Sequence, residues 1–424
     1  MRNAQKKAPL AELPLEVVAR MENRSLGPLE EHILEWPAFA RAYYRLHEAS
    51  RRYHLQNLET CAAELPELER GFADLVALPH SRRLELLRHP EDDTAPRFFT
   101  WLLAMRLLEE SQERTPLLPR QGYQLAEAAL AITRHLRARE YGGKAPLAEL
   151  QALAWAHQGN ALRVEGNLAE AAPHFTQAAE LLEGHRPAVA ALRAHTLWRL
   201  GAFERDRRDG AAARLHTEQA LIWARGQQSP LLTGALLLQR ASLDYEVGNL
   251  DGAIDSCQQV LTRLPRGSRS PLHTSAQVNL AHYMMRSGQF RAARKALRSA
   301  KGQLRELPVA ARVRVGWIEA AIQRGLGHLA EAEASYRQVR RGFLRLGRAF
   351  DGAIVTLELA LLLLEQGRTA EVASLAQEIH PIFEREGVHR EAQAAVLLLR
   401  DAAAQERLTA LMVIQLLGRL RGDG

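Results

Sequence analysis

The sequence predicts an all-α protein built as a solenoid of repeated helical hairpins, and three observations lead to this fold class. One short pattern, Gly-x-[Leu/Phe]-x-x-Ala, recurs at intervals of about 40 residues, and such periods are typical of repeat architectures. Ala, Leu, Arg and Glu are abundant, and all four are good helix formers. Runs of Val, Ile and Thr that alternate with polar residues are absent, so we expect almost no β-strand.

The recurring pattern fixes where the predicted hairpins turn. It starts at five glycines, the last of them in a variant copy: Gly166, Gly248, Gly288, Gly327 and Gly367. The 82-residue interval between the first two leaves room for one degenerate copy, and Arg208 stands at its glycine slot. Because glycine readily adopts a positive φ, we expect each slot to end one helix and begin the turn to the next.

A second register of small residues accompanies the turns. Seven residues before each glycine slot the chain has one of six small residues: Gly159, Gly201, Ala241, Ala281, Ala320 and Ala360. Large residues surround these positions, so six small ones in register indicate a place where two helices approach closely. We expect the second helix of each hairpin to lie against the first at this point.

These positions resemble the signature of the tetratricopeptide repeat (TPR). The clearest unit combines five residues: Trp155, Gly159, Gly166, Ala171 and Phe175. The resemblance covers about residues 152–403, and the long period makes the chain similar to the extended repeats of bacterial regulatory TPR proteins. The last hairpins, around 364–372 and 388–392, look like those of bacterial TPR proteins without an assigned activity. The resemblance implies a right-handed TPR superhelical solenoid.

We expect three parts along the chain. Residues 1–95 show no repeat and read as a small helical N-terminal domain. Residues 96–403 form the TPR solenoid of about seven helical hairpins, and residues 404–424 form a C-terminal capping helix, which a solenoid needs to cover its last face.

Composition and charge limit the kinds of partner and compartment. The two cysteines, Cys61 and Cys257, form neither a disulfide framework nor a zinc knuckle, and we see no signal peptide or membrane-spanning run, so we expect a cytoplasmic protein. The net charge is +7, but residues 261–348 alone carry 18 Lys and Arg against four acidic residues, a net +14 that leaves −7 for the rest. This segment predicts an acidic partner.

No arrangement of residues in the sequence predicts catalysis. His47-Glu48 opens like a zinc-protease helix, but Arg51 stands where the second histidine is needed. Phosphate-binding loops and the Gly-x-Ser-x-Gly elbow are absent. We therefore expect a non-enzymatic protein with no cofactor and no metal, whose glycines serve the repeat turns.

The TPR resemblance implies that the first helices of the hairpins line a concave groove, at the slots ten, six and three residues before each glycine. With Arg314, one turn before Trp317, the candidate partner-binding residues are Asn160, Arg163, Trp198, Arg205, Ser242, Tyr245, His282, Met285, Arg314, Trp317 and Arg324. Arg and Trp are favoured binding residues. Alternatively, the tryptophans fill gaps between long helices and the arginines are solvated. In the sixth copy the slots are Leu357, Leu361 and Leu364, too apolar for an open groove, so we expect them to be covered.

The sequence is compatible with two functions. The first is a scaffold that binds a protein or peptide in its groove, in bacterial regulation. The alternative is a nucleic-acid-associated protein that uses the basic repeats 261–348, for which binding would fall steeply with salt.

One segment near the N-terminus resembles the zinc motif of bacterial anti-sigma domains, with both cysteines replaced. His32 keeps the frame, but Trp36 and Phe39 stand where the thiols would be. A tetrahedral zinc site needs about four ligands, so we expect no zinc and an aromatic nucleus that includes Tyr43 and Tyr44. Alternatively, these rings form a contact for a partner helix.

Overall fold

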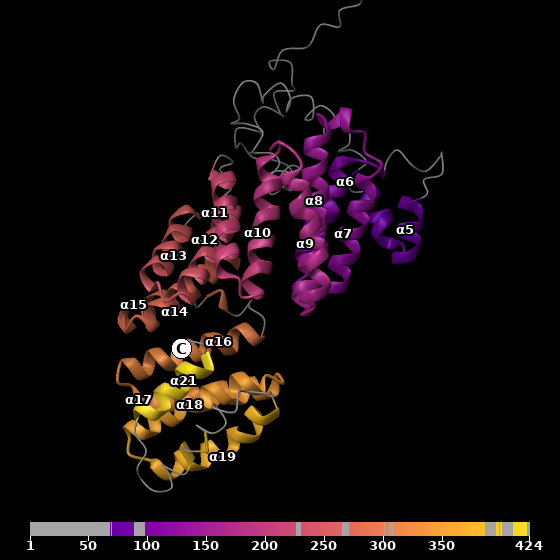
Figure 1. The fold of residues 1–424 in the computed structure, drawn as a ribbon. Coiled ribbons are helices and arrows are strands. Elements are labelled where there is room, and N and C mark those ends of the chain that lie inside the picture. Colours follow the sequence, from indigo (N-terminus) through magenta and orange to yellow (C-terminus); the bar gives the residue numbers. More distant parts are fainter. Residues whose placement is uncertain are drawn as a thin grey trace, which may run out of the picture. The chain divides into compact units, whose positions relative to one another are not determined.

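The structure is a computed structural model that describes residues 68, 70–88, 98–225, 230–264, 271–300, 302–304, 309–385, 396–397, 399–400 and 410–421. Every regular element among these residues is a helix (Figure 1), which confirms the predicted all-α solenoid class. The chain divides into two compact units, Met1–Leu243 and Asp244–Gly424, which we describe separately.

The first unit consists of antiparallel helix pairs in chain order. Its described elements are α5 (His80–Arg88), α6 (Trp101–Arg114), α7 (Pro119–Thr133), the 3-10 helix η2 (Ala138–Tyr141), α8 (Lys144–Glu165), α9 (Leu168–Glu183), α10 (Ala190–Asp206), α11 (Gly210–Arg225) and most of α12 (Pro230–Glu246). Within the pairs α6 packs on α7, α8 on α9 and α10 on α11, and the first helices α8 and α10 also contact each other. This is the packing of a helical repeat array.

The second unit continues the same pattern. Its elements are α13 (Leu250–Arg263), α14 (Pro271–Arg286), α15 (Phe290–Ala300), α16 (Val309–Gly325), α17 (Leu329–Arg345), α18 (Ala349–Glu365), α19 (Thr369–Arg385) and α21 (Ala410–Arg421). The pairs are α14 with α15, α16 with α17 and α18 with α19, and α14 contacts α16 as first helix to first helix. The C-terminal helix α21 packs on α18, so it lies against the first helix of the last pair.

The turns confirm the glycine register. All five glycine slots have φ between 74° and 96°, and the copy at Arg208 has φ 66°, the single positive value for a non-glycine residue among those described. Each slot closes the same pair of hydrogen bonds. In the first, Gly166 N–H donates to Arg163 O at 3.1 Å and Asn167 N–H to Leu162 O at 2.9 Å. These bonds satisfy carbonyls that a helix end leaves unpaired.

The small positions also lie where the sequence predicts close packing. Ala241, Ala281 and Ala320 have no exposed surface. At the two glycines a side chain would collide: a Cβ on Gly159 would lie 2.9 Å from the Phe175 ring, and one on Gly201 2.5 Å from Gln239 Nε2. Each pair of helices therefore depends on a small residue at its crossing point.

A buried carboxylate fixes the start of α10 in the first unit. Glu149 has no exposed surface. Its oxygens accept hydrogen bonds from the backbone N–H groups of Ala188 and Val189 and from Arg193 Nε at 2.9 Å. Because a buried charge is costly unless it is paired, this set of three donors holds the entry of α10 against α8.

Some predictions fall outside the described residues. They concern the aromatic nucleus around Trp36 and Phe39, the absence of zinc at His32, and the hairpin around 388–392. These stay predictions, as do the domain boundaries at 95/96 and 403/404.

Candidate functional site

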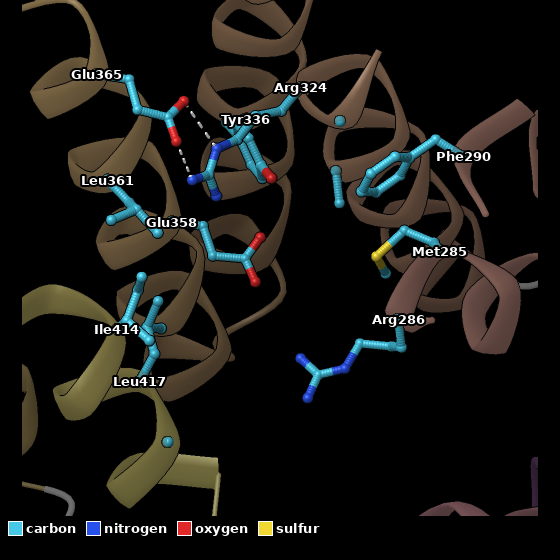
Figure 2. A pocket seen from close by; sticks show the side chains of 13 residues that line it. Met285, Arg286, Phe290, Arg324, Tyr336, Glu358, Leu361, Glu365, Ile414 and Leu417 are labelled. Carbon is cyan, nitrogen blue, oxygen red and sulfur yellow. Dashed lines mark hydrogen bonds and ion pairs between the residues drawn. The ribbon is translucent and has the colours of Figure 1, made fainter. Parts of the chain in front are cut away.

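The second unit contains a pocket of about 490 Å³ whose walls come from successive repeats (Figure 2). Its apolar wall consists of Met285 from α14, Phe290 from α15, Leu361 from α18, and Ile414 and Leu417 from α21. Pockets that hold small ligands or anchoring side chains typically measure about 300–1,000 Å³ and are mainly apolar. The size and lining therefore suit one or a few apolar side chains.

Small residues on α16 keep this space open. Ala321 lines the pocket, and Gly325 lies at the end of the same helix. The Phe290 ring packs directly on Gly325, since a Cβ at that glycine would lie 2.3 Å from the ring. The aromatic ring is thereby held at the side of the pocket while the methyl group of Ala321 leaves its interior unfilled.

Charged groups at the pocket are paired within the protein. Arg324 forms an ion pair with Glu365 through two nitrogens. Burial alone would lower the pKa of Arg324, but the hydrogen bonds to Glu365 and its charge outweigh this and raise the pKa. Glu358 is largely buried and accepts a hydrogen bond from Trp317 Nε1 at 2.8 Å. Figure 2 shows Arg286 extending from α14 on the side of the pocket opposite Glu358.

The helix α21 forms the remaining wall and covers the apolar slots of the sixth copy. Leu357 and Leu361 are buried in one cluster with Val413, Leu416 and Leu417 of α21. The expectation that these leucine slots are covered is confirmed. Ile414, by contrast, keeps 51% of its surface exposed at the pocket.

Two of the predicted groove residues of the second unit lie in the lining of this pocket, and the others do not. Met285 and Arg324 line the pocket. Trp317 does not line it, but its Nε1 donates a hydrogen bond to Glu358, which does. Tyr245 and His282 pack on each other with ring centroids 5.1 Å apart, outside the lining. Arg314 is exposed and lies outside it as well.

In the first unit the predicted groove residues engage one another. Arg163 donates to Asn160 Oδ1 at 2.9 and 3.1 Å and forms an ion pair with Asp206. Arg205 lies 3.3 Å from the same carboxylate. A partner at this surface would have to compete with Asp206, so these arginines are less available than the sequence suggests. Ser242, also in this unit, donates to Leu238 O at 3.1 Å.

Beside Trp198 lies a buried polar cluster that sequence reasoning missed. Arg199 is 4% exposed and donates to Gln112 Oε1 at 2.7 Å and to His195 O at 2.9 Å. Burial, with the charge of Arg163, lowers the pKa of Arg199 to about 9, and burial, with the charge of Arg199, lowers that of His195 to about 3. Trp198 lies 5.3 Å from the Arg199 guanidinium carbon, which supports a packing role for this tryptophan.

The described residues contain neither a metal-binding cluster nor a membrane-spanning helix. Within these ranges no three His, Cys, Asp or Glu side chains are grouped as metal ligands would be. In the part of the chain that the structure describes, no helix has the length and apolarity needed to cross a bilayer.

Comparison with known proteins gives the fold. No family model matches the sequence, and no curated protein matches it. A Rap protein complexed with competence and sporulation factor superposes with a TM-score of 0.56 over 75% of this chain and 86% of that one, at 11% identity. Weaker similarities are to BtubC from P. vanneervenii (TM-score 0.41, 18% identity, 56% and 90% covered) and yeast Tom70 (0.41, 14%, 92% and 77%). The chain thus shares the helical repeat fold of that Rap protein.

Proposed function

We propose that this chain is a non-enzymatic TPR-like scaffold that binds a protein or peptide partner on the first helices of its second unit. An apolar side chain of the partner enters the pocket between α14, α16, α18 and α21. The observation that carries the proposal is the position of this pocket: Met285 and Arg324 of its lining are candidate partner-binding residues from the TPR resemblance, and Ala321 lies one turn before Arg324 on the same helix.

The chemistry of the lining favours a peptide segment as the ligand. The apolar wall rewards burial of a large aliphatic or aromatic side chain at roughly 1.5–3 kcal/mol. Beside this wall lie a buried carboxylate, Glu358, and the Arg324–Glu365 ion pair. The donors and acceptors of that ion pair suit hydrogen bonds to the peptide backbone next to the anchoring side chain. Apolar anchors flanked by a few polar groups are typical of peptide recognition.

The role in bacterial regulation follows the resemblance to extended regulatory TPR repeats. The Rap protein with a similar fold was solved in a complex with competence and sporulation factor, and this supports a binding role for the fold. The alternative, a nucleic-acid-associated protein using residues 261–348, has less support, because Arg324, Arg337, Arg340 and Arg348 of that segment are paired with acidic side chains of the chain itself.

The test uses selection from a random peptide library displayed on phage, with the full-length protein as bait. Ala321→Trp fills the pocket, and Ala202→Trp places the same residue at the equivalent slot of the first unit as a matched control. Selected peptides should contain an apolar anchor and lose at least about tenfold in affinity for Ala321→Trp while binding Ala202→Trp normally, since one lost anchor is worth 1.4 kcal/mol or more.

Two results would contradict the proposal. Peptides that bind the wild-type protein and Ala321→Trp equally would show that the pocket is not the site. A steep loss of all binding with salt, with nucleic acid as the tighter ligand, would favour the alternative.

A further inference from the structure

The second helix of the α14–α15 pair, α15, carries a cationic face without acidic residues. Its eleven residues include Arg291, Arg294, Lys295 and Arg298 and no Asp or Glu. The opposite face is apolar and buried through Ala293, Leu297 and Ala300. The four cations therefore point away from the packed side of the helix; Arg291, Lys295 and Arg298 are exposed and Arg294 is half-buried.

Helical spacing gathers these charges into one compact surface. Positions 291, 294, 295 and 298 follow the i, i+3, i+4, i+7 pattern, so they lie on one face. With a rise of about 1.5 Å per residue, the two ends of the set are about 10 Å apart along the axis. Like charges at this spacing repel one another, so the helix gains nothing from them in the absence of a counter-charge.

The ion pairs of α15 and α17, the two arginine-rich second helices, differ. On α17, Arg337 pairs with Glu333 and Glu371, and Arg340 pairs with Glu378. Across the described residues, no carboxylate forms an ion pair with the four α15 cations. The charge count over 261–348 treats the two helices alike, whereas, among the described residues, two of the four α17 arginines are paired with carboxylates of the chain and none of the four α15 cations is.

We propose that this face of α15 binds an acidic segment of a protein partner, with carboxylates at helical spacing opposite the three arginines. Arg matches a carboxylate with two parallel hydrogen bonds, which favours this chemistry over diffuse attraction. The proposal does not depend on the pocket. Phe290 lines that pocket from the start of α15, but none of the four cations does.

Two observations favour an acidic protein over nucleic acid. The cationic face is bounded on one side: α13, the second helix of the preceding pair, exposes Asp251 and Asp255, so a phosphate backbone that extended onto it would meet like charge. In addition, α15 exposes no aromatic side chain among its four cations, whereas single-stranded nucleic acid is usually held by base stacking between basic residues.

The experiment measures the fluorescence anisotropy of a labelled twelve-residue peptide rich in Glu and Asp as the full-length protein is added. Single-stranded RNA and duplex DNA of matched charge are titrated in parallel. Arg291→Glu combined with Arg298→Glu reverses the α15 face. Arg341→Glu combined with Arg345→Glu changes the net charge equally at two exposed arginines of α17, so it controls for overall charge.

We expect the α15 variant to weaken peptide binding at least about tenfold and the α17 control less than about threefold, because losing charge-assisted hydrogen bonds costs far more than a change in net charge. Equal losses in both variants, no peptide binding by the wild type, or tighter nucleic-acid binding that depends on Arg291 and Arg298 would overturn the proposal. If circular dichroism shows that the Glu variant is misfolded, Arg291→Gln with Arg298→Gln removes the same hydrogen bonds without adding charge and is judged by the same criteria.

Discussion

Replacing Arg208 by glycine should stabilise the first unit. Arg208 occupies the turn position that is glycine in the other five copies, with φ 66°. Its N–H already donates to Arg205 O at 2.9 Å, and the N–H of Asp209 to Glu204 O at 2.9 Å, so glycine would keep both bonds. The exposed Arg208 side chain forms no ion pair with the residues that the structure describes, and its removal should cost little.

The expected magnitude follows from two opposing contributions. A left-handed conformation costs an L-residue about 1–2 kcal/mol. Glycine avoids this cost but loses about 0.5–1 kcal/mol through the greater freedom of the unfolded chain. The net gain for Arg208→Gly is therefore about 0.5–1 kcal/mol in the free energy of unfolding.

Urea unfolding followed by circular dichroism measures this difference in the free energy of unfolding. The slope of that free energy against urea concentration should be the same in the variant and the wild type. Because the two units can unfold in separate steps, hydrogen exchange of the amides in α10 and α11 gives the local value. Arg208→Ala is the matched control: it removes the same side chain but keeps a Cβ in the left-handed region. If the Gly variant is no more stable than the Ala variant, the backbone conformation at this turn does not limit stability and the reasoning fails.

Two further predictions concern packing and pH. Ala281→Leu and Ala320→Leu should each cost about 1–3 kcal/mol by overpacking a fully buried crossing point; thermal unfolding unchanged in both would show that the register is wrong. The folded pKa of His195, about 3, lies below the ordinary 6.5, so folding excludes a proton that the unfolded chain binds, and stability should fall as the pH drops from about 6.5 towards 3. Since His195 is half-buried, we expect about 2–3 kcal/mol rather than the full linkage value, and His195→Gln should flatten that acid limb of the urea stability curve by this amount.

The groove register could be predicted, but which of its residues are available could not. Met285 and Arg324 line the pocket, and their role in partner binding stays a prediction. The sequence missed Glu365 and Glu358, which pair with Arg324 and Trp317 across 41 residues. A signal for them does exist: first helices of successive hairpins contact each other, so opposite charges or polar partners one period apart are candidates for pairing.

The sequence by itself determined the turns and crossing points of this protein, because both depend on local rules. A turn with a positive φ needs glycine or a residue held in a strained conformation, as Arg208 is. A close crossing of two helices needs a small residue such as Ala320. Only the tertiary structure decided which arginines are neutralised and which helix covers Leu357 and Leu361, since the sequence predicted only that they are covered. Those outcomes depend on how each helix is rotated against neighbours some 40 to 60 residues away, and neither charge counts nor periodicity contains that rotation.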